Sequence, residues 1–206
     1  AKAAGFKYAV ITSKHHEGFA MWDSQVTDYK VTNTPIGRDL IKEWTDAFRA
    51  EGLKIGYYHS VIDWHHPDYI VDRIHPRRDD DREALNAGRD MRKYTEYLHA
   101  QVKELLSNYG KIDIIWFDFT PPDKSKADWD SENLVKLVRE LQPDIIINDR
   151  IDYPESADFV TPEQYQPKEW PTRNGQRVTW EACQTLNGSW GYDRGNLDWK
   201  SPEILI

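Results

Sequence analysis

Residues 109–119 read YGKIDIIWFDF, and this stretch decides the fold. Gly110 ends a helical pattern, and residues 112–117 then form an apolar block of strand length that is rich in β-branched and aromatic side chains. A nearly continuous apolar run is typical of a parallel strand covered on both faces. The run ends at Asp118, and α/β proteins place their chemistry at the carboxyl ends of such strands. The alternative is that Asp118 only caps the following turn.

The same pattern of strand, polar loop and helix recurs along the chain. The expected strands are residues 6–13, 53–60, 112–118, 144–148 and 178–185, and the expected helices are 38–50, 91–109 and 131–141. Ser131 is the expected N-cap of the last helix, and residues 71–83 read as a solvated, charged insertion. This alternation predicts parallel βα units.

The glycine-rich phosphate-binding motifs of nucleotide-binding folds do not occur in the sequence. A (β/α)8 barrel of the TIM type is therefore preferred over a doubly wound sheet. Such barrels need about 250 residues, so the 206 residues would supply about five βα units of an incomplete barrel. We expect residues 1–206 to be one partial catalytic barrel domain, cut from a longer protein, because Ala1–Gly5 resembles the last turn of a helix with its glycine cap.

Composition narrows the classes of partner. The net charge is −8 and no long basic run occurs, which argues against a nucleic-acid partner. One cysteine, Cys183, excludes an internal disulfide and a multi-cysteine metal site. No apolar run approaches the roughly 20 residues of a membrane span. Nine tryptophans are an unusual number, and aromatic side chains either fill the core or line carbohydrate clefts.

Polar and aromatic residues follow the end of every expected strand, and parallel strands bring such ends to one face. The residues concerned are His15 and His16, Tyr58 and His59, Asp118, Asn148 to Arg150, and Glu181. Carboxylates among aromatic and neutral hydrogen-bonding side chains suit glycoside hydrolysis, in which one carboxylate attacks the sugar and another acid protonates the leaving oxygen. Arg150 could supply a positive charge beside Asp118.

Seven segments, in order, resemble a family 29 α-L-fucosidase. They are HHEGF with WDS at residues 15–24, GLKIGYYHS with DW at 52–64, DIIWFD at 113–118, INDR at 147–150, TPE at 161–163, WEAC at 180–183 and SWGY at 189–192. The resemblance spans nearly all of the chain. It implies a (β/α)8-like barrel, a retaining double displacement on fucosylated oligosaccharides or polysaccharides, no cofactor, and a secreted or periplasmic location. It leaves the oligomeric state open.

The resemblance also implies roles for particular residues. Asp118 falls on the nucleophile, and Glu163 is the first choice for the acid/base, with Glu181 second. The expected substrate-binding residues are His15, His16, Trp22, Tyr58, Trp116, Arg150 and Glu181. Trp22 could instead be a packing residue, and Glu181 could instead hold its neighbours in place.

The chain departs from the family pattern in two ways. Phe119 stands where the family usually has glycine after the nucleophile, which would narrow or reshape the pocket. The family's first strand, with a histidine that binds fucose, and its closing strand are also not in this sequence. These departures keep an inactive fucose-binding relative open as an alternative. A metal-dependent barrel hydrolase is a third reading, although the adjacent pairs His15-His16 and His65-His66 fit metal spacing poorly.

Overall fold

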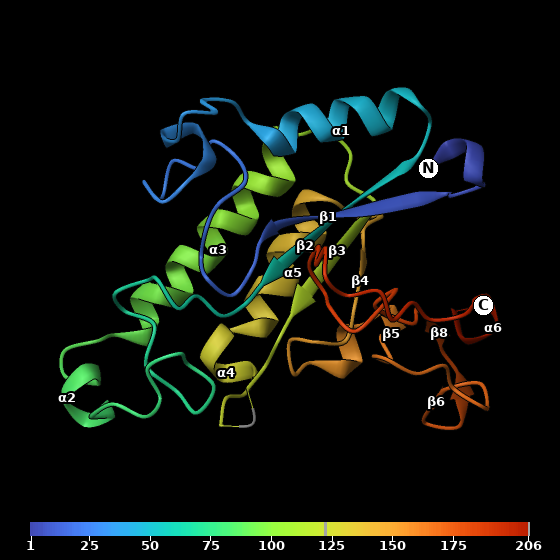
Figure 1. Ribbon diagram of the computed structural model, residues 1–206. Helices are drawn as coiled ribbons and strands as arrows, with labels where there is room; N and C mark the ends of the chain where they lie inside the picture. The colour runs from blue at the N-terminus through green and yellow to red at the C-terminus, as the bar shows by residue number, and fades with distance from the viewer. Residues whose placement is uncertain (122, 206) are drawn as a thin grey trace. The chain divides into compact units, whose positions relative to one another are not determined.

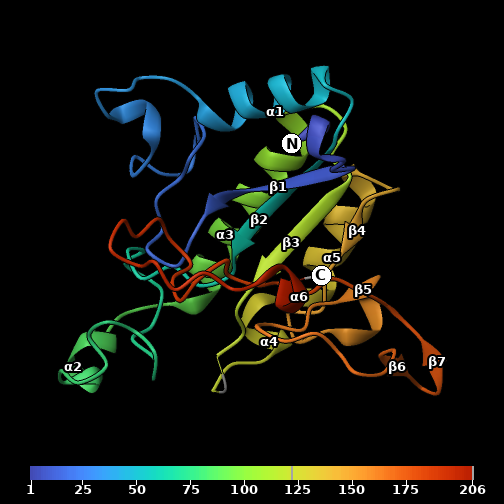
Figure 2. The ribbon, with the colours of Figure 1, turned by 45° about the vertical axis from the view of Figure 1, so that its right-hand side comes forward.

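The computed structural model describes residues 1–121 and 123–205, and the chain divides into two units, Ala1–Ala157 and Asp158–Ile206. A four-stranded parallel sheet is the centre of the first unit (Figure 1). Its strands are β1 (Tyr8–Lys14), β2 (Lys54–Ser60), β3 (Ile114–Asp118) and β4 (Ile146–Ile147). They lie in chain order, β1-β2-β3-β4, as Figure 2 shows. The predicted α/β class with a parallel sheet is confirmed.

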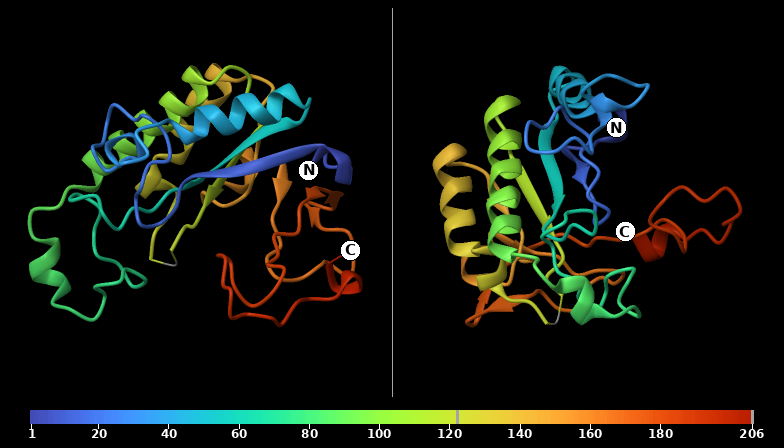
Figure 3. Two further views of the ribbon diagram at one scale, coloured as in Figure 1. Left: turned by 45° about the horizontal axis from the view of Figure 1, so that its top comes forward. Right: turned by 90° about the vertical axis from the view of Figure 1, so that its left-hand side faces the viewer.

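Three long helices connect these strands: α1 (Leu40–Ala50), α3 (Met91–Asn108) and α5 (Ser131–Leu141). All three lie on the same face of the sheet in both views of Figure 3. Two short helices, α2 (Arg82–Asn86) and α4 (Lys126–Trp129), and three 3₁₀ turns, η1 (Lys2–Ala4), η2 (Val31–Asn33) and η3 (Pro154–Ser156), lie in the connections. Each long helix therefore crosses between neighbouring parallel strands, as the βα pattern predicted.

The core of the first unit forms between this helical layer and the sheet. One stripe of α3 is wholly buried, as its spacing predicted: Tyr94, Leu98, Val102, Leu105 and Leu106. Gly56 in β2 allows close strand packing, because a Cβ there would lie 2.8 Å from Val10 Cγ2 and 3.1 Å from Ile114 Cβ. The register places Gly56 opposite both residues.

One local prediction is wrong and another holds only in part. Asp130 precedes α5 as its N-cap residue, and Ser131 is the first helical residue, whose hydroxyl donates to the Ile151 carbonyl oxygen at 2.7 Å. Most of the expected solvated insertion at 71–83 is exposed, but Asp72 and His75 within it are buried. Asp72 accepts hydrogen bonds from the Tyr69 hydroxyl and from the backbone N–H groups of two following residues, so this carboxylate organises the loop from inside.

The second unit consists mainly of loops. Its strands are β5 (Phe159–Val160), paired in parallel with β8 (Thr179–Trp180), and β6 (Thr172–Arg173), paired antiparallel with β7 (Gln176–Arg177); α6 (Pro202–Leu205) lies near its end. The strand expected at 178–185 is thus only two residues long and pairs with β5. Within the described residues the main sheet has four strands, not the expected five.

Candidate active site

Asp118, the last residue of β3, lies at the centre of a polar cluster at the carboxyl end of the sheet. The Tyr58 hydroxyl donates a hydrogen bond to its Oδ2 at 2.5 Å, and Arg150 Nη1 donates to its Oδ1 at 3.0 Å. The cation expected beside Asp118 is therefore present. Two directional, charge-assisted bonds fix the orientation of the carboxylate.

The parallel register explains why these side chains meet. Tyr58 of β2 lies opposite Trp116 of β3, and Ser60 lies opposite Asp118. Side chains two residues apart on a strand share a face, so all four side chains point to the same side of the sheet. Tyr57 and Phe117 alternate with them and are fully buried on the other side.

A row of stacked groups runs across this face. The His15 ring stacks on Tyr58 at a centroid distance of 5.5 Å, and Tyr58 stacks on Trp116 at 5.6 Å. The Arg150 guanidinium lies over the Trp116 ring, 4.6 Å from its centroid. Stacking and cation–π contact hold the side chains in place without using their polar atoms. These contacts bring His15, Tyr58, Trp116 and Arg150 together in one row, and Tyr58 and Arg150 connect that row to Asp118. Their roles in binding stay predictions.

His16 lies on the other side of the carboxylate, with its Nε2 4.0 Å from Asp118 Oδ2. Its Nδ1 is hydrogen-bonded to the Ser60 hydroxyl at 2.7 Å. The rings of Trp64 and Phe119 contact it edge-on at 5.4 and 5.7 Å. Burial, and then the positive charges of His15 and Lys14, lower the pKa of His16 to about 3. His16 is therefore a neutral hydrogen-bonding group at neutral pH.

Sequence reasoning missed the roles of Ser60 and Trp64. Ser60 could have been found, because it follows Tyr58 by two residues and so shares its face. Trp64 belongs to the DW pair at the end of segment 52–64, and its backbone N–H donates to the His16 carbonyl oxygen at 2.8 Å. That bond joins the segments that follow β1 and β2, which no local pattern reveals.

A pocket of about 450 Å³ opens beside Asp118. Its walls come from the end of β3 and the segments that follow β3 and β4: Asp118, Phe119, Thr120, Pro121, Lys124, Asp149, Arg150 and Asp152. Its volume is within the usual range of a small-molecule site.

Trp22 is not part of this cluster. Its side chain is 0% exposed, and its indole Nε1 donates to Glu104 Oε2 of α3 at 2.9 Å. The structure therefore supports the packing alternative for Trp22.

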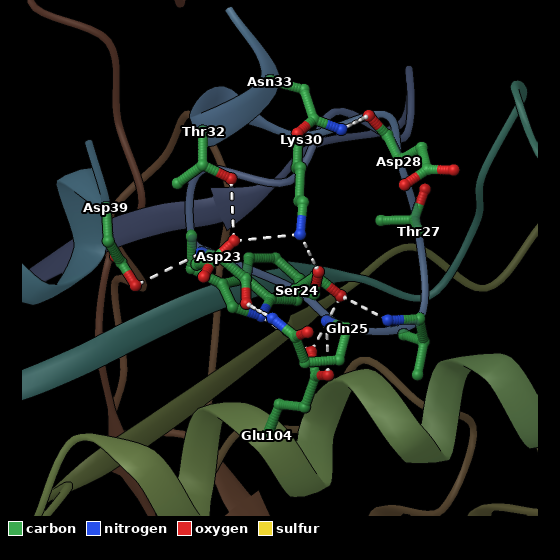
Figure 4. Close-up of polar contacts among 12 residues, drawn as sticks. Asp23, Ser24, Gln25, Thr27, Asp28, Lys30, Thr32, Asn33, Asp39 and Glu104 are labelled. Atoms are coloured by element: carbon green, nitrogen blue, oxygen red, sulfur yellow. Dashed lines mark hydrogen bonds and ion pairs between the residues drawn. The ribbon is translucent and has the colours of Figure 1, made fainter. Parts of the chain in front are cut away.

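The segment that follows Trp22 is held by a separate polar network (Figure 4). Glu104 accepts bonds from the Ser24 hydroxyl and the Gln25 backbone N–H, and Asp23 accepts bonds from Lys30 and Thr32. In Figure 4 Glu104 points from its helix toward this segment. The network fixes the segment that continues from the histidine pair.

The two candidate acids, Glu163 and Glu181, belong to the second unit. Glu163 forms a parallel bridge with Cys183, and the Glu181 backbone N–H donates to Val160 at 3.0 Å, so the two glutamates lie on paired segments. Asp118 belongs to the first unit. The choice between the two glutamates therefore stays a prediction.

Among residues 1–121 and 123–205, no three histidine, cysteine, aspartate or glutamate side chains gather as a metal site would require. In the same part of the chain, no helix combines the length and the apolar character needed to cross a bilayer.

The fold and the cluster define an α/β protein with a polar pocket at the carboxyl ends of its parallel strands. The chain belongs to the alpha-L-fucosidase family, whose family model matches residues 1–206. It is 29% identical over 205 residues to the tissue alpha-L-fucosidase of Homo sapiens, and the match covers 94% of this chain and 40% of that protein. A putative alpha-L-fucosidase 1 of Oryza sativa subsp. japonica is 31% identical over 150 residues, covering 71% of this chain and 25% of that protein.

Solved structures agree with this family. Alpha-L-fucosidase isoenzyme 1 from Paenibacillus thiaminolyticus superposes with a TM-score of 0.94 at 50% identity, over 99% of this chain and 51% of that one. Alpha-L-fucosidase AlfC from Lactobacillus casei, in complex with its α-L-fucose product, superposes at 0.80 with 34% identity, over 99% of this chain and 64% of that one. The chain thus spans about 40% of the human relative and half to two thirds of these solved structures.

Proposed function

We propose that the complete protein is a retaining exo-α-L-fucosidase that releases terminal α-L-fucose from oligosaccharides or polysaccharides. The observation that carries this proposal is Asp118 at the pocket, oriented by Tyr58 and Arg150. Membership of the alpha-L-fucosidase family supports it. AlfC, a solved relative, is described in complex with Fuca(1,6)GlcNAc, which supports a fucosylated glycan as the substrate class.

In the proposed first step, an Asp118 oxygen attacks the anomeric carbon of fucose, and the bond from that carbon to the leaving oxygen breaks. Glu163 gives its proton to the leaving oxygen. In the second step Glu163 takes a proton from water, the water oxygen attacks the same carbon, and the bond to Asp118 breaks. Retaining chemistry of this kind requires the two carboxyl groups to lie about 5–5.5 Å apart.

The other residues around Asp118 would bind the sugar. His15 and neutral His16 offer ring nitrogens to hydroxyl groups, and Trp116 offers an apolar face that is itself held by Tyr58 and Arg150. Arg150 also keeps a positive charge beside the carboxylate that attacks. Glu181 remains the second candidate for the acid and otherwise a substrate-binding residue.

We infer further that the four-stranded sheet is part of a (β/α)8 barrel. The strands follow chain order and the three long helices cover one face, whereas a doubly wound sheet carries helices on both faces. The superposition of this chain on a solved alpha-L-fucosidase supports this inference.

The experiment compares four variants of the complete protein on an aryl α-L-fucoside. Asp118→Asn should lower kcat by about 10³-fold or more, because no nucleophile remains. Asp113→Asn is the matched control, since Asp113 lies before the amino end of β3 and accepts a hydrogen bond from Ile55; it should keep its kcat. Glu163→Gly should lose activity and regain it with azide, whereas Glu181→Gly should not be rescued.

Unchanged turnover by Asp118→Asn contradicts the nucleophile assignment. Rescue of Glu181→Gly in place of Glu163→Gly transfers the acid/base role to Glu181. A wild-type protein that binds fucose in calorimetry and releases none from any fucoside is the inactive relative.

A further inference from the structure

Phe119 has a backbone φ of +80° directly after Asp118. This is the left-handed region, which glycine adopts freely and which crowds the Cβ of any other residue. Strained residues of this kind persist where the surrounding structure imposes them, and they gather at functional sites. Phe119 occupies such a position at the wall of the pocket.

The chain is held on both sides of Phe119. The Asp118 carbonyl oxygen accepts the Val61 backbone N–H at 2.7 Å. The Thr120 hydroxyl donates to the Arg150 carbonyl oxygen at 3.1 Å and accepts the Trp129 indole N–H at 3.2 Å. These contacts come from segments after β2 and β4 and from α4, so the backbone direction at Phe119 is imposed from three places.

The Phe119 ring closes one side of His16. Its ring centroid lies 5.7 Å from that of His16 at an interplanar angle of 67°, and Trp64 contacts the same imidazole at 5.4 Å. Ser60 holds the Nδ1 atom of His16. The imidazole is thus held by one hydrogen bond, two aromatic edge contacts and the tilted His15 ring, whose centroid lies 4.0 Å from that of His16. Among these four partners within the described residues, only Phe119 also lines the pocket.

We propose that Phe119 is a positioning residue: its ring holds His16 in the orientation that meets a fucose hydroxyl, and the strained backbone is retained because it aims the ring there. This inference rests on the proposed function and extends it to a residue that does not itself react. Glycine at this position would relax the backbone and free the imidazole.

The test compares Phe119→Gly, Phe119→Ala and Phe119→Tyr in the complete protein. Gly and Ala both remove the ring, so both should raise KM for an aryl α-L-fucoside about tenfold, the worth of one hydrogen bond, with little change in kcat. Phe119→Tyr keeps an aromatic ring and should have the KM of the wild type. Because only Gly relieves the strain, its Tm should exceed that of Ala by about 2–4 °C.

A readout that needs no ligand is the NMR titration of His16. The titratable or charged groups around His16 are Lys14 and His15 from its own segment and Asp118 from β3, and Tyr58 and Arg150 are bonded to that carboxylate. None of these changes in the variants. Loss of the ring admits water, so the pKa of His16 should rise by about one unit or more in Phe119→Gly. In the wild type His16 should stay neutral down to about pH 4.

Asp130→Gly is the matched control, because Asp130 also has a positive φ, +48°, but lies between α4 and α5. It should change Tm without changing KM or the His16 titration. Unchanged KM and an unchanged His16 titration in Phe119→Gly overturn the inference. If the wild-type protein releases no fucose, the proposed function fails, while the titration still decides the role of Phe119.

Discussion

At the scale of single residues, Tyr58 connects the Asp118 carboxylate to the row of stacked rings. Its hydroxyl donates to Asp118 Oδ2 at 2.5 Å, and its ring stacks between His15 and Trp116. The hydroxyl and the ring can be separated by mutation, because phenylalanine keeps the stack and removes only the donor.

We expect Tyr58→Phe to lower kcat/KM on an aryl α-L-fucoside by about 10- to 100-fold. A hydrogen bond to a charged group contributes about 1.5–3 kcal/mol, and each 1.4 kcal/mol is a factor of ten. Steady-state kinetics on the complete protein measures this change.

Tyr57→Phe is the matched control for that measurement. Tyr57 lies next to Tyr58 on β2 but faces α1, where its hydroxyl is hydrogen-bonded to Thr45 at 2.7 Å. It should lose about 1 kcal/mol of stability and keep its kcat/KM. A Tyr58→Phe enzyme with the kinetics of Tyr57→Phe would show that the Tyr58 hydroxyl has no part in the reaction.

Which site residues could be predicted depends on where their partners lie in the chain. Asp118 and Tyr58 stand at strand ends, so an apolar run followed by a polar residue was enough to find them. The contacts of Trp64 and Phe119 with His16 join three separate segments, and no local pattern carries that information. Tryptophan is a residue type that often lines ligand clefts, but Trp22 is buried in the core. Its indole N–H donates a hydrogen bond to Glu104, which lies 82 residues away in the sequence.

At the scale of elements, an irregularity at the end of β1 buries a charged side chain. The pairing with β2 shifts between Thr12 and Lys14, so that Lys14 pairs with His59. Such a shift re-aims the side chains that follow it. Lys14 Nζ then lies 3.2 Å from Asp63 Oδ2, and the two side chains are 0% and 1% exposed.

This ion pair ties together the segments that carry the histidines. Lys14 directly precedes His15 and His16, and Asp63 Oδ1 accepts the backbone N–H groups of His65 and His66. Burial lowers the pKa of Lys14, and the nearby Asp63 carboxylate opposes that change. A buried pair holds its geometry well, but removing one partner leaves the other charge uncompensated.

Lys14→Met should therefore destabilise the protein by about 3–5 kcal/mol, because Asp63 remains buried and unpaired. The double variant Lys14→Met/Asp63→Asn should recover part of that loss, since asparagine keeps an acceptor for the two N–H groups without the charge. Urea unfolding of the wild type, both single variants and the double variant gives the coupling energy. Additive losses would show that the pair does not hold these segments together.

The elements themselves divide into predictable and unpredictable ones for a physical reason. Long periodic helices such as α3 and buried strands such as β3 can be predicted from the spacing of their apolar residues. The segment 178–185 has strand composition, but its partner is β5, and strand propensity says nothing of which strand pairs with which. The hairpin of β6 and β7 turns at Asn174 and Gly175, which both have a positive φ, and an Asn-Gly pair is typical of such a turn.

At the scale of the molecule, the first unit contains four histidines whose pKa burial lowers: His16, His59, His66 and His75. An unfolded histidine takes up a proton near pH 6.5. In the folded state these histidines are protonated only at a lower pH. Between pH 6.5 and the lowered pKa of the folded state, the unfolded state therefore binds more protons. Stability is then fully present above pH 6.5 and falls as the pH drops through the unfolded value.

His16 offers the sharpest form of this prediction, since its pKa is lowered to about 3. Between pH 7 and pH 5 it alone should reduce the free energy of unfolding by about 2 kcal/mol. His16→Asn keeps a polar group near Ser60 but cannot titrate, so its stability should fall by about that much less over the same interval. Urea unfolding at pH 5, 6 and 7, followed by tryptophan fluorescence, measures both slopes, and carboxylates contribute little because they titrate mainly below pH 5. If the free energy of unfolding falls equally with pH in the wild type and in His16→Asn, His16 has the same pKa in the folded and the unfolded chain. That result would contradict the description of His16 as an enclosed, neutral imidazole beside Asp118.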